Sequence, residues 1–265
     1  MTFEEICDIK DKSEKVNRLY EKINEDDRLT HSKSSKVEFL TTVRYIEKYL
    51  KSGDKILDVG AGTGIYSLYF AKKGYEVDAI ELADANIKVF EKKITSDLKL
   101  KLQQGNGMDL SRYEDESFDM VFVFGPLYHL RKDVDKLKCL EEAKRVCKKD
   151  GKIFVAFIGK EASFLADGLL YNPDFWLCEE YDHDTFDIIR APFEFHTPDD
   201  AKNIMIKADI HIDHMVASDG VSEFMADKID RLTDEQYAQY LKWHYYSCES
   251  PYMLGTSSHL LFIGR

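Results

Sequence analysis

The sequence KILDVGAGTGIYSLYFAKKGYEVDAIE, residues 55–81, has the pattern of a strand, a glycine turn, a helix and a second strand. Residues 55–59 form a short apolar run, and glycine occupies every second position over residues 60–64 before a helical pattern begins. Glycine suits such a turn because it adopts positive φ readily and lets backbone N–H groups approach a ligand without a Cβ in the way. The second strand covers residues 75–80, and Glu81 stands at its end. The stretch therefore predicts an α/β fold that holds a ligand at the turn.

The spacing of the glycines narrows the choice of ligand. The dinucleotide fingerprint G-x-G-x-x-G needs a third glycine where this chain has Ile65, which disfavours a nicotinamide oxidoreductase. The observed G-x-G-x-G, with Asp58 two residues before it, resembles motif I of the class I S-adenosylmethionine-dependent methyltransferases. Glu81 fits this resemblance because a carboxylate there can accept hydrogen bonds from both ribose hydroxyls. The resemblance implies S-adenosylmethionine as the cofactor and S-adenosylhomocysteine as its product.

The resemblance also assigns cofactor contacts to other parts of the chain. After the third strand, Asn106 or Asp109 would reach the adenine, with a plain surface turn as the alternative. In the N-terminal arm, Arg28 or Arg44 would pair with the methionine carboxylate, unless both are solvated surface arginines. The expected cofactor-binding residues are Asp58, Gly60, Ala61, Gly62, Thr63, Gly64, Glu81, Leu82, Asn106, Gly107, Met108, Asp109, Phe124, Gly125, Arg28 and Tyr20.

A second motif, G-P-L-Y-H-L at residues 125–130, follows an apolar fourth strand. Ligands of open α/β sheets bind just outside the carboxyl ends of the strands, so this motif should border the reaction site. It resembles a signature of a bacterial group of small methyltransferases within class I, and implies Tyr128 and His129 as catalytic residues. A pKa of about 6.5 would suit His129 as a general base. The alternative is that His129 hydrogen-bonds the cofactor loop or caps the next helix. The same group is indicated by Asp27-Arg28-Leu29, by Glu38-Phe39 and by P-x-x-L-G-x-S-x-H-L at residues 251–260.

The remaining apolar patterns predict the architecture around this core. We expect a Rossmann-like three-layer α/β/α sandwich with a seven-stranded, mostly parallel sheet, and the resemblance adds that the last strand is antiparallel. Within a single domain, residues 1–50 should form an N-terminal helical arm and residues 51–159 the S-adenosylmethionine-binding core. Residues 160–195, which are rich in aromatic and acidic side chains, should form a lid, and residues 196–265 should complete the sheet.

Composition limits the class of protein. The 265 residues are 44% hydrophobic and 32% charged, which suits one domain with an elaboration. The start of the chain is acidic and lacks the pattern of a signal or transit peptide, and no apolar run reaches about 18 residues. The five scattered cysteines form no C-x-x-C pair and fit a reduced cytoplasm, where we expect the protein to be. His183, His196, His211 and His214 lack ligand partners at metal-binding spacing, so no metal is expected.

The sequence therefore predicts a methyltransferase that acts on an N, O or S atom of a small molecule, as a monomer or homodimer. The net charge of −12 disfavours a nucleic-acid substrate, although a local basic patch could still bind tRNA or rRNA, which is the runner-up acceptor. A non-catalytic S-adenosylmethionine-binding module is the other alternative. Aromatic rings beside carboxylates in the lid would suit a cationic or aromatic acceptor, unless these rings are simply the core of the lid.

Overall fold

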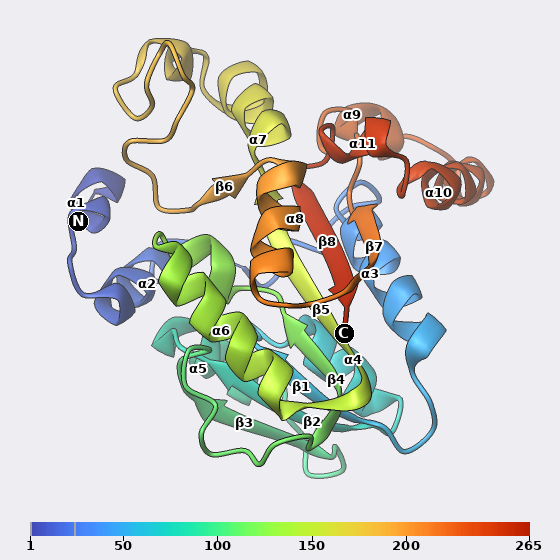
Figure 1. Cartoon of the computed structure of the whole chain (residues 1–265). Coiled ribbons are helices and arrows are strands. Elements are labelled where there is room, and N and C mark those ends of the chain that lie inside the picture. The colour runs from blue at the N-terminus through green and yellow to red at the C-terminus, as the bar shows by residue number, and fades with distance from the viewer. Residues whose placement is uncertain (1, 24) are drawn as a thin grey trace.

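The computed structural model describes residues 2–23 and 25–265 and is built around one twisted sheet (Figure 1). Seven strands follow the order β3-β2-β1-β4-β5-β8-β7, and β6 pairs with the end of β5. The strands are β1 (Lys55–Val59), β2 (Glu76–Glu81), β3 (Leu100–Gln104), β4 (Phe118–Val123), β5 (Cys147–Gly159), β6 (Phe195–His196), β7 (Ile212–Ala217) and β8 (His259–Gly264).

The strand directions agree with the predicted fold. β1, β2, β3, β4 and β5 pair in parallel, whereas β8 is antiparallel to both of its neighbours, β5 and β7. The central strands β1 and β4 are almost entirely buried, as parallel strands covered on both faces should be. The prediction of a mostly parallel Rossmann-like sheet with an antiparallel last strand is therefore confirmed.

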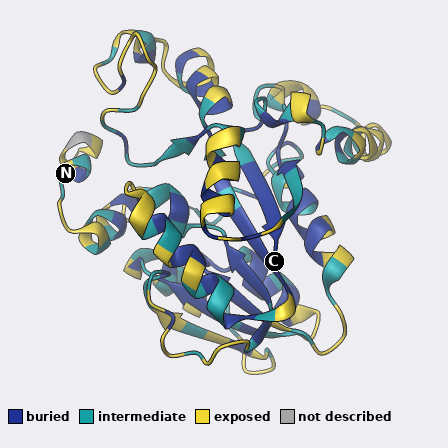
Figure 2. Cartoon of the chain, viewed as in Figure 1, coloured by how far each residue is buried: buried dark blue, intermediate teal, exposed yellow. Residues whose placement is uncertain are grey.

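Helices cover both faces of the sheet and make the three layers. Side chains alternate along β1, so that Leu57 and Val59 pack with α6 and α8 on one face, while Ile56 packs with α3 and α4 on the other. Figure 2 shows the buried sheet between helices that are exposed on their outer sides. The α-helices are α1 (Phe3–Cys7), α2 (Lys12–Tyr20), α3 (Lys36–Tyr49), α4 (Ile65–Lys72), α5 (Asp84–Glu91), α6 (Asp133–Val146), α7 (Lys160–Ala166), α8 (Pro198–Lys207), α9 (Ala226–Ile229), α10 (Asp234–Ser247) and α11 (Pro251–Leu254).

Local sequence explains where two of these helices begin. The side chains of Thr197 and Thr233 each accept a hydrogen bond from the backbone N–H three residues on, and the side chains of Asp200 and Gln236 each accept one from the backbone N–H of the threonine. These are capping boxes, which satisfy N–H groups that a helix start leaves free. Residues 148–151 lie inside β5, where the register with β4 shifts between Phe118 and Met120.

The segment at residues 160–195 projects beyond the end of the sheet (Figure 1). It holds α7, the short helices η2 (Asp167–Tyr171) and η3 (Pro173–Leu177), and a bridge between Tyr181 and Ile188. Phe164, Phe175 and Tyr181 pack together as a small core of this segment. Most of its buried aromatic rings therefore hold the segment itself together, whereas Tyr171 remains 65% exposed. Among the described residues, no helix has both the length and the apolar character needed to cross a lipid bilayer.

Candidate cofactor site

A cavity lies at the carboxyl ends of β1, β2 and β4, under the N-terminal arm. It brings together the glycine turn, the tip of β2, the segment after β3 and the G-P-L-Y-H-L motif, which are far apart in the sequence. Of the predicted cofactor-binding and catalytic residues, those that line it are Asp58, Gly60, Ala61, Gly62, Thr63, Glu81, Leu82, Asn106, Gly107, Met108, Phe124, Gly125, Arg28, Tyr20, Tyr128 and His129. Gly64 and Asp109 do not line it.

The three glycines of the turn all have positive φ, but they serve different purposes. A Cβ on Gly60 would lie 2.6 Å from the Cδ of Pro126, so this glycine lets the turn pack against the segment that follows β4. A Cβ on Gly64 would lie 2.2 Å from the ring of Phe90, which explains why Gly64 faces the core and not the cavity. Gly62 alone has open space where its Cβ would be, and it lines the cavity. Gly62 is therefore the position where a ligand can approach the backbone.

Glu81 holds the glycine turn in place from the tip of β2. Its Oε2 accepts a hydrogen bond from the N–H of Gly62 at 2.8 Å, and its Oε1 accepts from the N–H of Ala83 at 2.8 Å and from Nδ2 of Asn86 at 3.3 Å. Burial raises the pKa of Glu81, although these donors oppose the rise. Glu81 thus shapes the cavity as well as lining it.

Asp58 has one carboxylate oxygen with no partner among the described residues. Its Oδ2 accepts from the hydroxyl of Ser67 at 2.6 Å, while its buried Oδ1 makes no hydrogen bond. Burial raises the pKa of Asp58 to about 7, and the nearby charge of Glu81 adds to this rise, although hydrogen bonds from Ser67 oppose it. An unpaired buried acceptor is costly, and a ligand that carries a donor or a positive charge would relieve that cost. S-adenosylmethionine carries both an ammonium and a sulfonium group, so the residues fit this cofactor.

The segment after β3 forms the opposite wall. The amide oxygen of Asn106 accepts from the N–H of Met108 at 3.0 Å and keeps a second lone pair, and no other described residue accepts a hydrogen bond from its NH₂ group. A Cβ on Gly107 would lie 2.9 Å from Val59, so this glycine allows the segment to approach β1. Asp109 is exposed and accepts from the N–H of Ser111 at 3.1 Å, outside the cavity. Of the two side chains predicted to reach adenine, only Asn106 lines the cavity.

Aromatic side chains close the end of the cavity nearest the G-P-L-Y-H-L motif. The hydroxyl of Tyr20 lies 3.0 Å from Nε2 of His129, and the hydroxyl of Tyr128 donates to the carbonyl oxygen of Phe124. Burial, with a smaller effect from Lys15, lowers the pKa of His129 to about 3, so its ring is neutral at pH 7. This pKa differs from the value near 6.5 expected from the sequence. The reason is that the ring is enclosed among Tyr20, Tyr128 and Phe193, away from any carboxylate.

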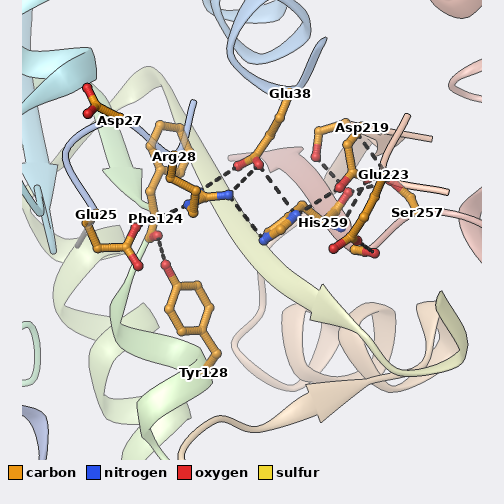
Figure 3. A network of polar contacts seen from close by, with 12 residues as sticks. Glu25, Asp27, Arg28, Glu38, Phe124, Tyr128, Asp219, Glu223, Ser257 and His259 are labelled. Carbon is orange, nitrogen blue, oxygen red and sulfur yellow. Dashed lines mark hydrogen bonds and ion pairs between the residues drawn. The ribbon is translucent and has the colours of Figure 1, made fainter. Parts of the chain in front are cut away.

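Arg28 lies at the edge of the cavity and is already engaged by carboxylates (Figure 3). Its Nη1 and Nη2 donate to the two oxygens of Glu38 at 2.7 and 3.2 Å, and its Nε donates to Glu25 at 3.1 Å. Most of its donors are therefore used before any ligand binds. Arg44 lies elsewhere, 4.7 Å above the ring of Tyr245, and does not line the cavity.

Sequence reasoning missed part of the lining. The missed residues are Lys12, Val16, Glu25, Leu29, Ile65, Tyr66, Asn86, Gly105, Pro126 and Leu130. Those from the arm reach the cavity only through tertiary packing, which no local pattern reports. Asn86 did leave a signal, since it is a polar residue early in an otherwise amphipathic helix, and it is almost fully buried, with 4% of its surface exposed.

Comparisons with known proteins agree with this geometry. Residues 57–155 match a family model described as a methyltransferase domain. A demethylmenaquinone methyltransferase of Clavibacter sepedonicus is 33% identical over 105 residues, which cover 39% of this chain and 41% of that protein. A ubiquinone biosynthesis O-methyltransferase of Pasteurella multocida is 31% identical over 119 residues, which cover 41% of this chain and 48% of that protein. The chain thus spans less than half the length of these two relatives.

A solved structure shows the same fold over nearly the whole chain. The geranyl diphosphate C-methyltransferase of Streptomyces coelicolor, solved with Mg²⁺, geranyl diphosphate and S-adenosylhomocysteine, superposes with a TM-score of 0.58 at 13% identity. The superposition covers 96% of this chain and 97% of that one. The glycine turn, β2 and β4 therefore lie in the part of the chain that matches a methyltransferase domain, the superposition shows a shared fold, and the domain match supports S-adenosylmethionine as the cofactor.

Proposed function

We propose that this protein is an S-adenosylmethionine-dependent methyltransferase that methylates an N, O or S atom of a small molecule. The observation that carries the proposal is the unpaired, buried Oδ1 of Asp58 in a cavity formed by the glycine turn, within the part of the chain that matches a methyltransferase domain. A cationic cofactor supplies what this oxygen lacks. The proposal includes membership of the bacterial group indicated by residues 125–130, and a cytoplasmic location.

The cofactor supplies an activated methyl group on a sulfonium. In the transfer, a lone pair of the acceptor atom forms the new bond to the methyl carbon, while the carbon–sulfur bond breaks and its electron pair stays on sulfur. The acceptor then loses its proton to water or a nearby base. The task of the protein is to align the two reactants, and alignment alone can lower the barrier by about 7–11 kcal/mol in well-oriented systems.

In this proposal the residues of the cavity divide the cofactor among them. Asp58 contacts the positively charged part of the cofactor, and the backbone of Gly62 lies against the cofactor. Glu81 holds the ribose, and Asn106 and Met108 border the adenine. Tyr20, Tyr128 and Gly125 surround the methyl group. A ring with a pKa of about 3 accepts a proton poorly at pH 7. His129 therefore acts by holding Tyr20 in position, and it does not serve as the general base.

Two segments outside the core cover the site in this proposal. Residues 1–50 contribute Tyr20, Arg28 and Leu29 to the cavity, which supports their role as an arm that closes over the cofactor. Residues 160–195 form the lid over the acceptor. The small-molecule acceptor is supported by the net charge of −12 and by the quinone-pathway names of the two relatives.

The test is a calorimetric titration of the ligand-free protein with S-adenosylhomocysteine, beside a titration with NADH. We expect micromolar binding of the first, which corresponds to about −8 kcal/mol, and no binding of the second. Transfer of a labelled methyl group from S-adenosylmethionine to an acceptor from a small-molecule extract then separates an enzyme from a binding module. Binding of NADH without S-adenosylhomocysteine would show that the glycine turn holds a dinucleotide instead.

A further inference from the structure

A second cavity adjoins the cofactor site. Arg28 lines both, so the two share a wall at the N-terminal arm. The second cavity has a volume of about 500 Å³. Its other walls come from the start of α3 and the turn before it, the start of α9 and the loop before it, the end of η2 and the first residue of β8. A molecule in this cavity would come nearest the cofactor cavity at Arg28.

The lining of this second cavity is strongly acidic. Its carboxylates are Glu38, Asp219, Glu223 and Asp227, and its cationic groups are Arg28 and His259. Although burial opposes the charged form, Glu38 and Asp219 raise the pKa of His259 to about 9. Even with His259 charged, the carboxylates outnumber the cations, and a neutral His259 would only increase the imbalance.

Internal ion pairs account for two of the carboxylates, Glu38 and Asp219 (Figure 3). Glu38 pairs with Arg28 at 2.7 Å, and Asp219 pairs with Nδ1 of His259 at 2.9 Å. Among the described residues, Glu223 accepts hydrogen bonds only from neutral hydroxyls, those of Tyr171 and Ser258. Asp227 makes no hydrogen bond or ion pair with another described residue. The excess negative charge therefore belongs to Glu223 and Asp227.

The same side of the cavity carries apolar and aromatic surface. Leu170 and Tyr171 come from the lid, where they are 45% and 65% exposed, and Phe224 lies next to Glu223 in the chain. Tyr171 is not part of the small aromatic core of the lid. Its hydroxyl bonds Glu223, so this contact joins the lid to the loop before α9. Aromatic faces beside carboxylates are a suitable environment for an organic cation.

From these features we infer that the second cavity is the methyl-acceptor site, and that it takes a small organic cation whose positive group is held by Glu223 and Asp227 with Tyr171 beside them. This inference rests on the proposed function, since it supplies the acceptor for the same reaction. Arg28 does not repel such a ligand strongly, because Glu25 and Glu38 already neutralise it.

A metal ion is the competing occupant. Glu38, Asp219 and His259 present ligand atoms that all lie within 4.8 Å of one another. However, Nδ1 of His259 already donates to Asp219, and the guanidinium of Arg28 already bridges both oxygens of Glu38. A metal would have to displace these contacts, whereas an organic cation at Glu223 and Asp227 displaces none.

The experiment measures binding of matched small molecules to the protein saturated with S-adenosylhomocysteine. Tyramine and cadaverine are the cations, and tyrosol and 1,5-pentanediol are their neutral counterparts, in which a hydroxyl replaces each ammonium. Ligand-observed NMR gives the dissociation constants. We expect at least one amine to bind about tenfold more tightly than its alcohol, as a charged hydrogen bond in a partly buried site allows. In Glu223→Gln and in Asp227→Asn this preference should shrink severalfold, while S-adenosylhomocysteine still binds as in the wild type.

Glu179→Gln is the matched control, because Glu179 is an exposed carboxylate of the lid that lines neither cavity. It should keep the full preference for the amine. Equal binding of amine and alcohol in both pairs overturns the inference, as does stoichiometric binding of Zn²⁺ that Glu38→Gln abolishes. If S-adenosylhomocysteine itself does not bind, the proposed function fails; if it binds and no amine is preferred, only this inference fails.

Discussion

Gly62 and Gly64 provide a matched pair of substitutions that separates cofactor binding from folding. Both glycines have positive φ, 57° and 86°, so any side chain at either position costs about 1–2 kcal/mol of backbone strain. At Gly62 a Cβ meets no atom within 4 Å, and it enters the cavity. At Gly64 a Cβ would lie 2.2 Å from the ring of Phe90, which adds an overpacking cost of about 1–3 kcal/mol.

We therefore expect Gly62→Val to lower the free energy of unfolding by about 1–2 kcal/mol and to weaken S-adenosylhomocysteine binding at least about a hundredfold, because the side chain occupies ligand space. Gly64→Ala should lose about 2–5 kcal/mol of unfolding free energy, yet its folded fraction should bind the ligand. Urea unfolding and calorimetry measure the two quantities. If Gly62→Val binds S-adenosylhomocysteine as the wild type does, or if it is the less stable of the two, the placement of the cofactor against this turn is wrong.

Three further predictions test individual side chains. Because the pKa of Asp58 is raised from 3.8 to about 7, its charge opposes folding increasingly from about pH 4 to pH 7. A bound ammonium favours the charged form. The calorimetric affinity for S-adenosylhomocysteine should therefore rise roughly tenfold from pH 6 to pH 8 in the wild type and stay flat in Asp58→Asn. Glu81→Ala should weaken S-adenosylhomocysteine binding by about 1–3 kcal/mol. It should also lower the urea midpoint, because the N–H groups of Gly62 and Ala83 lose their acceptor. If the affinity and the midpoint are both unchanged, Glu81 is not part of the site. His129→Gln should lower the rate of labelled methyl transfer without changing its pH profile between about pH 6 and pH 9, since the pKa of His129 is about 3, and loss of an ionisation step in this range would restore His129 as the base.

The sequence was sufficient for the core of the fold because its decisive signals are local. The alternation along β1, the glycine turn and the tip of β2 lie within one short stretch, and the cavity forms where those elements meet. Buried strands such as β4 are nearly continuous in apolar residues, so their assignment needed no tertiary information. The same locality explains why Glu81 and Asp58 were found.

The sequence was insufficient where a role depends on what packs against a residue. Gly64 belongs to the same motif as Gly62, but only the position of Phe90 shows that it faces the core. The pKa of His129 depends on the rings around it, and those come from the arm and from the segment before β6. From the sequence, Arg44 and Arg28 both look like solvated arginines of the arm until Tyr245 and Glu38 are placed beside them.

Short motifs that had no chemical explanation in the sequence acquire one in the network of Figure 3. Three residues that are far apart in the sequence lie in one chain of contacts. Arg28 precedes α3 in the arm, Glu38 lies in α3, and His259 begins β8. Arg28 pairs with Glu38, and Nη1 of Arg28 lies 3.4 Å from Nε2 of His259. Asp219 continues this chain through His259 and accepts from the hydroxyl of Ser257. These contacts fasten the arm to the last strand at the wall between the two cavities. The residues at both ends of the sequence are thus required together, because neither the cofactor cavity nor the acidic cavity beside it has that wall without them.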